Sequence, residues 1–149
     1  MPAALFICVA VLACATGSAA PRDRASHPQL RLSLAAGDEP PTAGSPITLE
    51  LTLANEGDAA LVLDFPDAQR FDFEVVAEDG AIVWRWAEGR FFAQVLGRET
   101  LDPGASLNWT GQIESGLPAA TYRLVGTLTT VERQTVETTL TVLSGADDP

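Results

Sequence analysis

Five of the seven carboxylates in one stretch of the sequence, residues 64–92, are the side chains best suited to metal or acid–base chemistry. They are Asp64, Asp67, Asp72, Glu78 and Asp79. Calcium takes about six to eight oxygen ligands in a defined array, and this spacing does not match the loop of an EF-hand. A glycosidase needs two carboxylates across a cleft, which nothing in the sequence arranges. We therefore interpret these carboxylates as solvated and predict no metal site.

The nucleophiles and general bases of common enzymes are scarce in this chain. Its one histidine is His27, its two cysteines are Cys8 and Cys14, and it has no lysine. The remainder of the chain can therefore hold neither a Ser–His–Asp nor a Cys–His constellation, and it has no cysteine for a zinc site or a disulfide. We predict a non-enzymatic protein without a cofactor.

The net charge of −11 arises from twenty acidic residues against nine arginines. Such a surface repels nucleic acid and anionic membranes, because phosphate binding requires clustered cations. We predict no nucleic-acid partner and interpret the charge chiefly as a source of solubility. The apolar fraction of 46% is sufficient for a packed core.

Residues 1–20 are typical of a secretory leader, with an apolar segment at 3–15 followed by small residues at 16–20. Residues 1–4 carry no basic side chain, which departs from the usual pattern. Two interpretations stay open: a cleaved signal peptide, or a lipoprotein anchored through Cys14, since residues 11–14 resemble a lipobox. Either predicts an exported protein, periplasmic or extracellular. Membrane contact then comes only through a lipid at Cys14, with residues 21–28 as a linker.

The domain is expected at residues 29–143, followed by an acidic tail at 144–149. Alternating apolar residues or β-forming runs predict strands in several segments. These are residues 30–34, 47–53, 60–63, 71–77, 81–86, 106–113, 122–130 and 135–143. Residues 91–95 are expected as a short strand or helical turn, and residues 100–104 as a turn around Pro103-Gly104. Seven to nine strands without a helix predict an immunoglobulin-like antiparallel β-sandwich without a disulfide, with a closed β-barrel as the alternative.

The two strands at 71–77 and 81–86 are predicted to form a hairpin, with the turn at Asp79-Gly80. Because side chains alternate along a strand, the rings of Phe71 and Phe73 share one face of the first strand and the carboxylates of Asp72 and Glu74 share the other. Arg85 is expected to pair with one of these carboxylates across the hairpin. Phe71, Phe73, Trp84 and Trp86 are interpreted as core residues, with exposed anchors for a partner as the alternative.

Five segments of this sequence resemble the BsuPI family, named for an intracellular proteinase inhibitor. They are Asn55, FPDAQRFDF at 65–73, DGAIVWRWA at 79–87, Phe92-Ala93-Gln94 and Pro103-Gly104. The match spans about residues 49–128, and Trp-Arg-Trp is the most specific part of it. The sequence departs from the family pattern at Asp67-Ala68, Phe71 and Ala87, where the family has Ser-Gly, Tyr and Ser.

The resemblance implies a β-sandwich that binds a protein partner and, by its name, inhibits a serine proteinase. The alternative is an accessory envelope domain that acts only through protein assembly. Loops carry most binding residues on such scaffolds, which favours residues 65–70 and 87–96. The candidate partner-binding residues are Phe65, Gln69, Arg85, Arg90, Phe91, Phe92 and Gln94. The competing interpretation is that Phe65, Phe91 and Phe92 only cap the open end of the sandwich.

Overall fold

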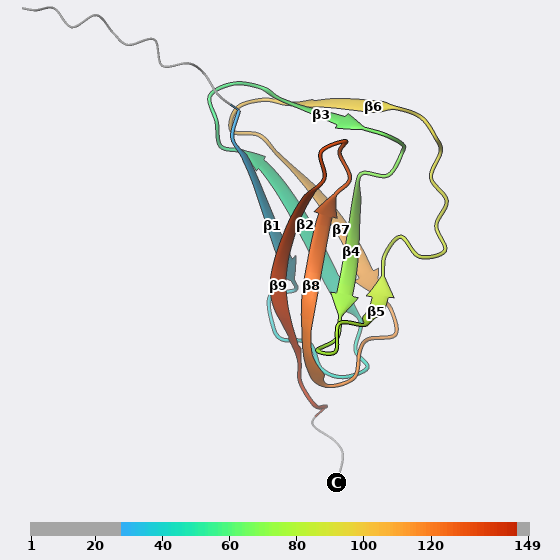
Figure 1. Ribbon diagram of the computed structural model, residues 1–149. Coiled ribbons are helices and arrows are strands. Elements are labelled where there is room, and N and C mark those ends of the chain that lie inside the picture. The colour runs from blue at the N-terminus through green and yellow to red at the C-terminus, as the bar shows by residue number, and fades with distance from the viewer. Residues whose placement is uncertain (1–27, 146–149) are drawn as a thin grey trace, which may run out of the picture.

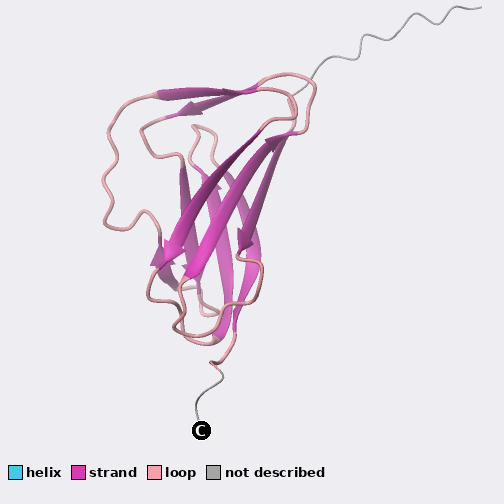
Figure 2. Ribbon diagram, turned by 180° about the vertical axis from the view of Figure 1, so that it is seen from behind, coloured by secondary structure: helices cyan, strands magenta, loops and turns pink. Residues whose placement is uncertain are grey.

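The computed structural model describes residues 28–145 of the 149-residue chain as two packed antiparallel sheets and a two-stranded ribbon (Figure 1). Seen from behind, this part of the chain consists of strands joined by loops, without a helix (Figure 2). The nine strands are β1 (Leu30–Ala36), β2 (Ile47–Asn55), β3 (Leu61–Phe65), β4 (Phe71–Val76), β5 (Ile82–Arg85), β6 (Gly97–Leu101), β7 (Ser106–Ile113), β8 (Ala120–Leu128) and β9 (Gln134–Val142).

One sheet has the order β1-β2-β7 and the other the order β5-β4-β8-β9. Strict alternation of buried and exposed residues begins β2, and its inward side chains include Leu49 and Leu51. They meet Phe73, Val75 and Leu124 of the facing sheet in the larger hydrophobic core. The predicted immunoglobulin-like sandwich is therefore confirmed, and the sheets do not close into the alternative barrel.

The ribbon of β3 and β6 crosses one end of the sandwich (Figure 1). Beneath it lies a second core, formed by Leu53, Leu63, Phe65, Leu101 and Leu128. Buried Asn55 joins the end of β2 to this ribbon, because its Nδ2 donates to the carbonyl oxygen of Leu101 at 3.0 Å. The ribbon thus closes the sandwich at this end with apolar side chains and one buried amide.

A tyrosine corner fixes the crossing from one sheet to the other between β7 and β8. The hydroxyl of Tyr122, near the start of β8, donates to the carbonyl oxygen of Pro118 at 2.9 Å. The same contact is a hallmark of immunoglobulin-like sandwiches at the start of the equivalent strand. Here it operates without the inter-sheet disulfide of antibody domains, because residues 28–145 contain no cysteine.

Two sequence predictions about local structure are wrong. Residues 91–95 form neither a strand nor a helical turn, but an irregular part of a loop. The predicted turn at 100–104 begins too early, because Thr100 and Leu101 belong to β6 and pair with Val62 and Leu61. The expected leader at 1–20 and the lipidation site at Cys14 lie outside the described residues. Between residues 28 and 145 no helix is long and apolar enough to span a membrane.

Candidate binding loop and its anchors

The predicted hairpin of β4 and β5 leads into the β5–β6 loop, residues 86–96, which runs along the side of the sandwich up to the ribbon (Figure 1). The start of this loop is fixed by Asp72, which is 3% exposed. One carboxylate oxygen of Asp72, Oδ1, accepts the backbone N–H of Phe73 at 2.9 Å and that of Ala87 at 3.0 Å. The other, Oδ2, accepts Nε of Arg85 at 2.7 Å. A single buried carboxylate therefore joins β4, β5 and the first residues of the loop.

Arg85 confirms the predicted pairing across the hairpin and extends it to both carboxylates. Its Nε lies 2.7 Å from Asp72 and 3.3 Å from Glu74. The hydrogen bond to Asp72 raises the pKa of Arg85 above its usual value. Burial opposes this effect, and the nearby charges of Asp72, Glu74 and Glu88 each add a smaller increase. Arg85 therefore stays positively charged at every pH near neutrality.

Trp86 anchors the loop through its ring. The ring centroid lies 4.2 Å from that of Phe71, and the backbone N–H of Trp86 donates to the carbonyl oxygen of Phe73. Gly111 of β7 leaves room for this packing, since a Cβ there would meet the rings of Phe73 and Trp86 at 2.8–2.9 Å. Of the four predicted core residues, Phe73 is fully buried, while Phe71, Trp84 and Trp86 are partly buried against the same core.

Arg90 folds back onto the start of the loop. Its guanidinium lies over the Trp86 ring at 4.2 Å from the centroid, and its Nε donates to the carbonyl oxygen of Trp86 at 2.8 Å. The chain can reverse there because Gly89 has a φ of 72°, a conformation that side chains with a Cβ rarely adopt. The charge of Arg90 is thus used to stabilise the loop itself.

The far end of the loop is tied to the segment between β3 and β4. The backbone N–H of Ala68 donates to the carbonyl oxygen of Ala93 at 2.9 Å. That segment is held in turn by Arg70, whose guanidinium contacts the Phe65 ring, the carboxylate of Glu99 and the carbonyl oxygen of Asp67. The loop is therefore supported at both ends by groups outside it.

The loop exposes apolar side chains, one between these supports and two between Ala93 and β6. Phe91 is 100% exposed, Leu96 83% and Val95 63%. Large apolar side chains occur singly on most protein surfaces, but here three lie within six residues of one loop. An exposed aromatic side chain such as Phe91 is typical of protein–protein interfaces, in which aromatic residues are enriched.

The structure brings together four of the seven predicted binding residues. Gln69, Arg85, Arg90 and Phe92 line one shallow groove of about 550 Å³ beside the loop. Phe91 and Gln94 are exposed on the loop itself. Phe65 does not belong with them, because it is 1% exposed and packs in the core beneath the ribbon. Val95 and Leu96 were missed as candidates, although two adjacent apolar residues at the end of a predicted loop were a signal for them.

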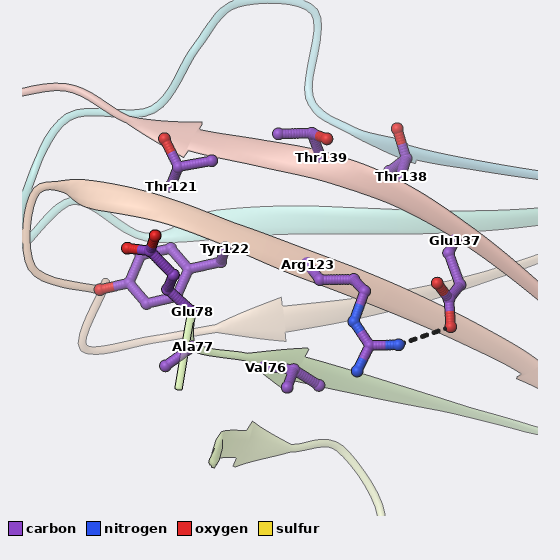
Figure 3. A pocket seen from close by; sticks show the side chains of 9 residues that line it. All are labelled: Val76, Ala77, Glu78, Thr121, Tyr122, Arg123, Glu137, Thr138 and Thr139. Carbon is purple, nitrogen blue, oxygen red and sulfur yellow. Dashed lines mark hydrogen bonds and ion pairs between the residues drawn. The ribbon is translucent and has the colours of Figure 1, made fainter. Parts of the chain in front are cut away.

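A larger groove of about 680 Å³ lies on the outer face of the four-stranded sheet (Figure 3). Short side chains of β8 and β9 line much of it, including Thr121 and Thr139, beside Tyr122. Its one arginine, Arg123, is paired with Glu137 at 2.8 Å (Figure 3). Since its polar side chains do not converge on a point, this groove carries no chemistry that we can assign.

The carboxylates considered for calcium lie apart or are engaged. Asp72 binds Arg85, and Asp64 binds Arg98 at 2.6 Å across the ribbon. That hydrogen bond lowers the pKa of Asp64 and raises the pKa of Arg98. Within residues 28–145, His, Cys, Asp and Glu side chains form no group of three or more that could hold a metal ion.

The family described as BsuPI, intracellular proteinase inhibitor, matches residues 34–133 of this chain. Comparison with curated protein sequences gives no match. The match covers the hairpin, the β5–β6 loop and most of both sheets.

Several solved structures are similar to this chain at low sequence identity. A CARDB domain from Pyrococcus furiosus is 13% identical, with a TM-score of 0.46 over 79% of this chain and 96% of that one. A sporulation control protein from Bacillus subtilis is also 13% identical, with a TM-score of 0.48 over 79% of this chain and 50% of that one. The C-terminal domain of wzt is 9% identical, with a TM-score of 0.48 over 84% and 81%. Because all three TM-scores are below 0.5, these similarities carry no argument about fold or function.

Proposed function

From the premise that this chain belongs to the BsuPI family of intracellular proteinase inhibitors, we propose that it inhibits a serine proteinase by blocking its substrate cleft with the β5–β6 loop. The observation that supports the proposal best is the combination found in residues 86–96. The loop is held at both ends by Asp72, Trp86 and Ala68, yet it exposes Phe91, Val95 and Leu96.

The family description corrects one of the sequence predictions. An exported location, periplasmic or extracellular, was expected from residues 1–20, but the family is described as intracellular. The prediction of export is therefore wrong by this comparison. The partner proposed here is accordingly an intracellular proteinase.

A supported loop suits inhibition for a physical reason. Binding costs the entropy of ordering whatever is mobile, so a segment already fixed in its bound shape binds more tightly with the same contacts. Asp72 and Arg90 fix the first turn of the loop, and Ala68 fixes its far end. In protease–inhibitor complexes the backbone of the interface moves by less than about 1 Å on binding, as expected for parts that are ordered beforehand.

The exposed apolar side chains favour a binding module over a purely structural domain. Burial of Phe65, Phe91 and Phe92 together would support the capping interpretation. Only Phe65 is fully buried, Phe92 is partly buried, and Phe91 has no cover at all. Each large apolar side chain moved from water into a partner contributes about 1.5–3 kcal/mol, which is the driving force that this loop offers. Such inhibition is steric, so it needs neither a catalytic group nor a cofactor.

The test is inhibition of a subtilisin-type serine proteinase by the full chain, with two double variants compared. Val95→Ser/Leu96→Ser removes apolar surface from the loop. Val62→Ser/Val131→Ser removes a similar amount of exposed aliphatic surface from β3 and the turn between β8 and β9. We expect the wild type and the second variant to inhibit with equal inhibition constants, and the first variant to inhibit at least about tenfold more weakly.

Equal loss in both variants would show that the effect is not specific to the loop and would contradict the proposed site. Failure of the folded wild-type chain to inhibit any serine proteinase tried would contradict the proposed function itself. The alternative of an accessory domain that acts through assembly would then be preferred.

A further inference from the structure

Phe91 differs from both of its neighbours in the loop. The side chain of Arg90 is bound to Trp86 through its Nε and its guanidinium face. Phe92 is partly buried, and its ring centroid lies 6.0 Å from that of Trp86. The ring of Phe91 is 100% exposed. Of three adjacent large side chains, the two outer ones are directed onto the protein and the middle one is left for a partner.

The backbone around Phe91 is also free to bind. Within residues 28–145, the N–H and C=O groups of Phe91 and Phe92 make no hydrogen bond, whereas the flanking residues do. The N–H of Arg90 donates to Ala87, and the carbonyl oxygen of Ala93 accepts from Ala68. A segment with free main-chain groups between two fixed points can pair with an exposed strand of another protein. Proteinases bind their substrates through side-chain pockets, of which the first sets specificity.

We propose that Phe91 is the specificity-determining residue of the inhibitor: its ring enters the primary specificity pocket of the proteinase, while the main chain of Phe91 and Phe92 pairs with the edge of the enzyme's cleft. This inference rests on the proposed function and adds the class of partner. The partner is a proteinase whose pocket is deep and apolar and accepts a large aromatic side chain.

The neighbouring residue, Arg90, argues against a partner proteinase that selects basic side chains. A proteinase with a carboxylate at the base of its pocket would select a basic side chain. Arg90 could supply one only by giving up its contact with the Trp86 ring and its hydrogen bond to the Trp86 carbonyl oxygen. Those contacts hold the turn that presents Phe91. Arg90 is therefore a positioning residue, and the aromatic ring determines specificity.

The experiment measures inhibition constants of the full chain against three serine proteinases with known pocket preferences: chymotrypsin for aromatic residues, trypsin for basic residues and elastase for small residues. The variants are Phe91→Ala, Phe91→Arg and, as a matched control on the same loop, Leu96→Ala. Since the Phe91 side chain is fully exposed, its variants should unfold at the wild-type denaturant concentration, which is measured for each.

We expect the wild type to inhibit chymotrypsin most strongly and Phe91→Ala to lose at least about 30-fold, the loss typical of an interface hot spot. Leu96→Ala should lose less. Phe91→Arg should inhibit trypsin in place of chymotrypsin, because the specificity pocket of each enzyme selects the side chain that enters it.

Two results would overturn this inference while leaving the proposed function in place. One is chymotrypsin inhibition that Phe91→Ala does not weaken. The other is a Phe91→Arg variant that no longer inhibits chymotrypsin and does not inhibit trypsin. That result would place the Phe91 ring outside the specificity pocket. Inhibition of subtilisin but of none of these three enzymes by the folded wild type would also overturn this inference alone, whereas absence of inhibition of all four would remove the proposed function, and this inference with it.

Discussion

Two arginine–aspartate pairs in this protein have nearly the same geometry and lie in different surroundings. Arg85 and Asp72 are 2.7 Å apart at the base of the β5–β6 loop, and Arg98 and Asp64 are 2.6 Å apart on the ribbon. The side chain of Asp72 is 4% exposed, whereas that of Asp64 is 48% exposed. The distance between the charges therefore does not distinguish the two pairs, but the access of water to the carboxylate does.

The pairs also differ in what else each carboxylate holds. Asp72 accepts two backbone N–H groups besides Arg85 and so connects two strands to a loop. The Asp64 carboxylate accepts a hydrogen bond from Arg98, which is its direct partner in the β3–β6 register. The comparison indicates that the surface ion pair of Asp64 adds little to two strands that already pair through their backbones. The buried carboxylate of Asp72, with its several hydrogen-bond donors, instead determines the path of the chain.

The largest expected effect comes from Asp72→Ala. It removes the charged partner of Arg85 and leaves the N–H groups of Phe73 and Ala87 without their acceptor. We expect the free energy of unfolding to fall by about 2–4 kcal/mol, measured by urea denaturation. Asp72→Asn is the matched control: it keeps an acceptor oxygen and should lose clearly less. A loss below about 0.5 kcal/mol for Asp72→Ala would contradict the role given to this carboxylate.

A smaller effect is expected from Arg85→Lys, which sharpens the comparison by leaving Asp72 in place. A lysine side chain has no Nε–H partway along it like that of arginine, which here lies near both the Asp72 and the Glu74 carboxylates. The free energy of unfolding should fall by about 1 kcal/mol. Amide hydrogen exchange at Ala87 should remain slow, since its acceptor is still present. Fast exchange there would show that Arg85, and not Asp72, holds the start of the loop.

Asp64→Ala should have little effect on the free energy of unfolding, because both partners of its ion pair are in contact with water. Any difference from the wild type should disappear in about 1 M NaCl, where surface charges are screened over about 3 Å. The difference between Asp72→Ala and the wild type should persist in the same salt. A salt-independent loss in Asp64→Ala would mean that the two pairs are more alike than their exposure indicates.

The smallest effect concerns pH. The hydrogen bond from Arg98 lowers the pKa of Asp64 below its ordinary value of 3.8. A lowered pKa in the folded state contributes stability that is present above the unfolded pKa and is lost as the pH falls through the folded value. An NMR titration of the Asp64 carboxyl carbon should therefore give a pKa that rises toward the ordinary value in Arg98→Gln. An unchanged pKa in that variant would contradict the assigned cause.

The base of the loop was largely predictable from the sequence. The alternation of side chains along 71–77 and 81–86 placed Asp72, Glu74 and Arg85 on one face, and the structure joins these three. The Asp79-Gly80 turn was equally local, and Gly80 has the expected positive φ of 87°. Side-chain parity and turn chemistry depend on neighbours in sequence, so they can be read from it.

The ribbon was not predictable in the same way. Residues 97–101 have no alternating apolar pattern, and the Pro103-Gly104 signal placed the turn over the end of β6. That strand exists because it pairs with β3, more than thirty residues earlier, and because Arg70 reaches Glu99. Phe65 was assigned to a binding loop for the same reason: its burial depends on Leu101 and Leu128, which are distant in sequence.

The first and last strands of the sandwich have a mechanical consequence. Leu30 begins β1 at the ribbon end, and Val142 completes β9 at the opposite end (Figure 1). A force that separates these two residues acts along both strands. It must slide β1 past β2 across the register from Leu30–Asn55 to Ala36–Leu49, so the hydrogen bonds of that pair bear the load together and cannot open one after another. The same geometry applies to β9 against β8, and the domain should therefore resist tension along its long axis far better than tension across it.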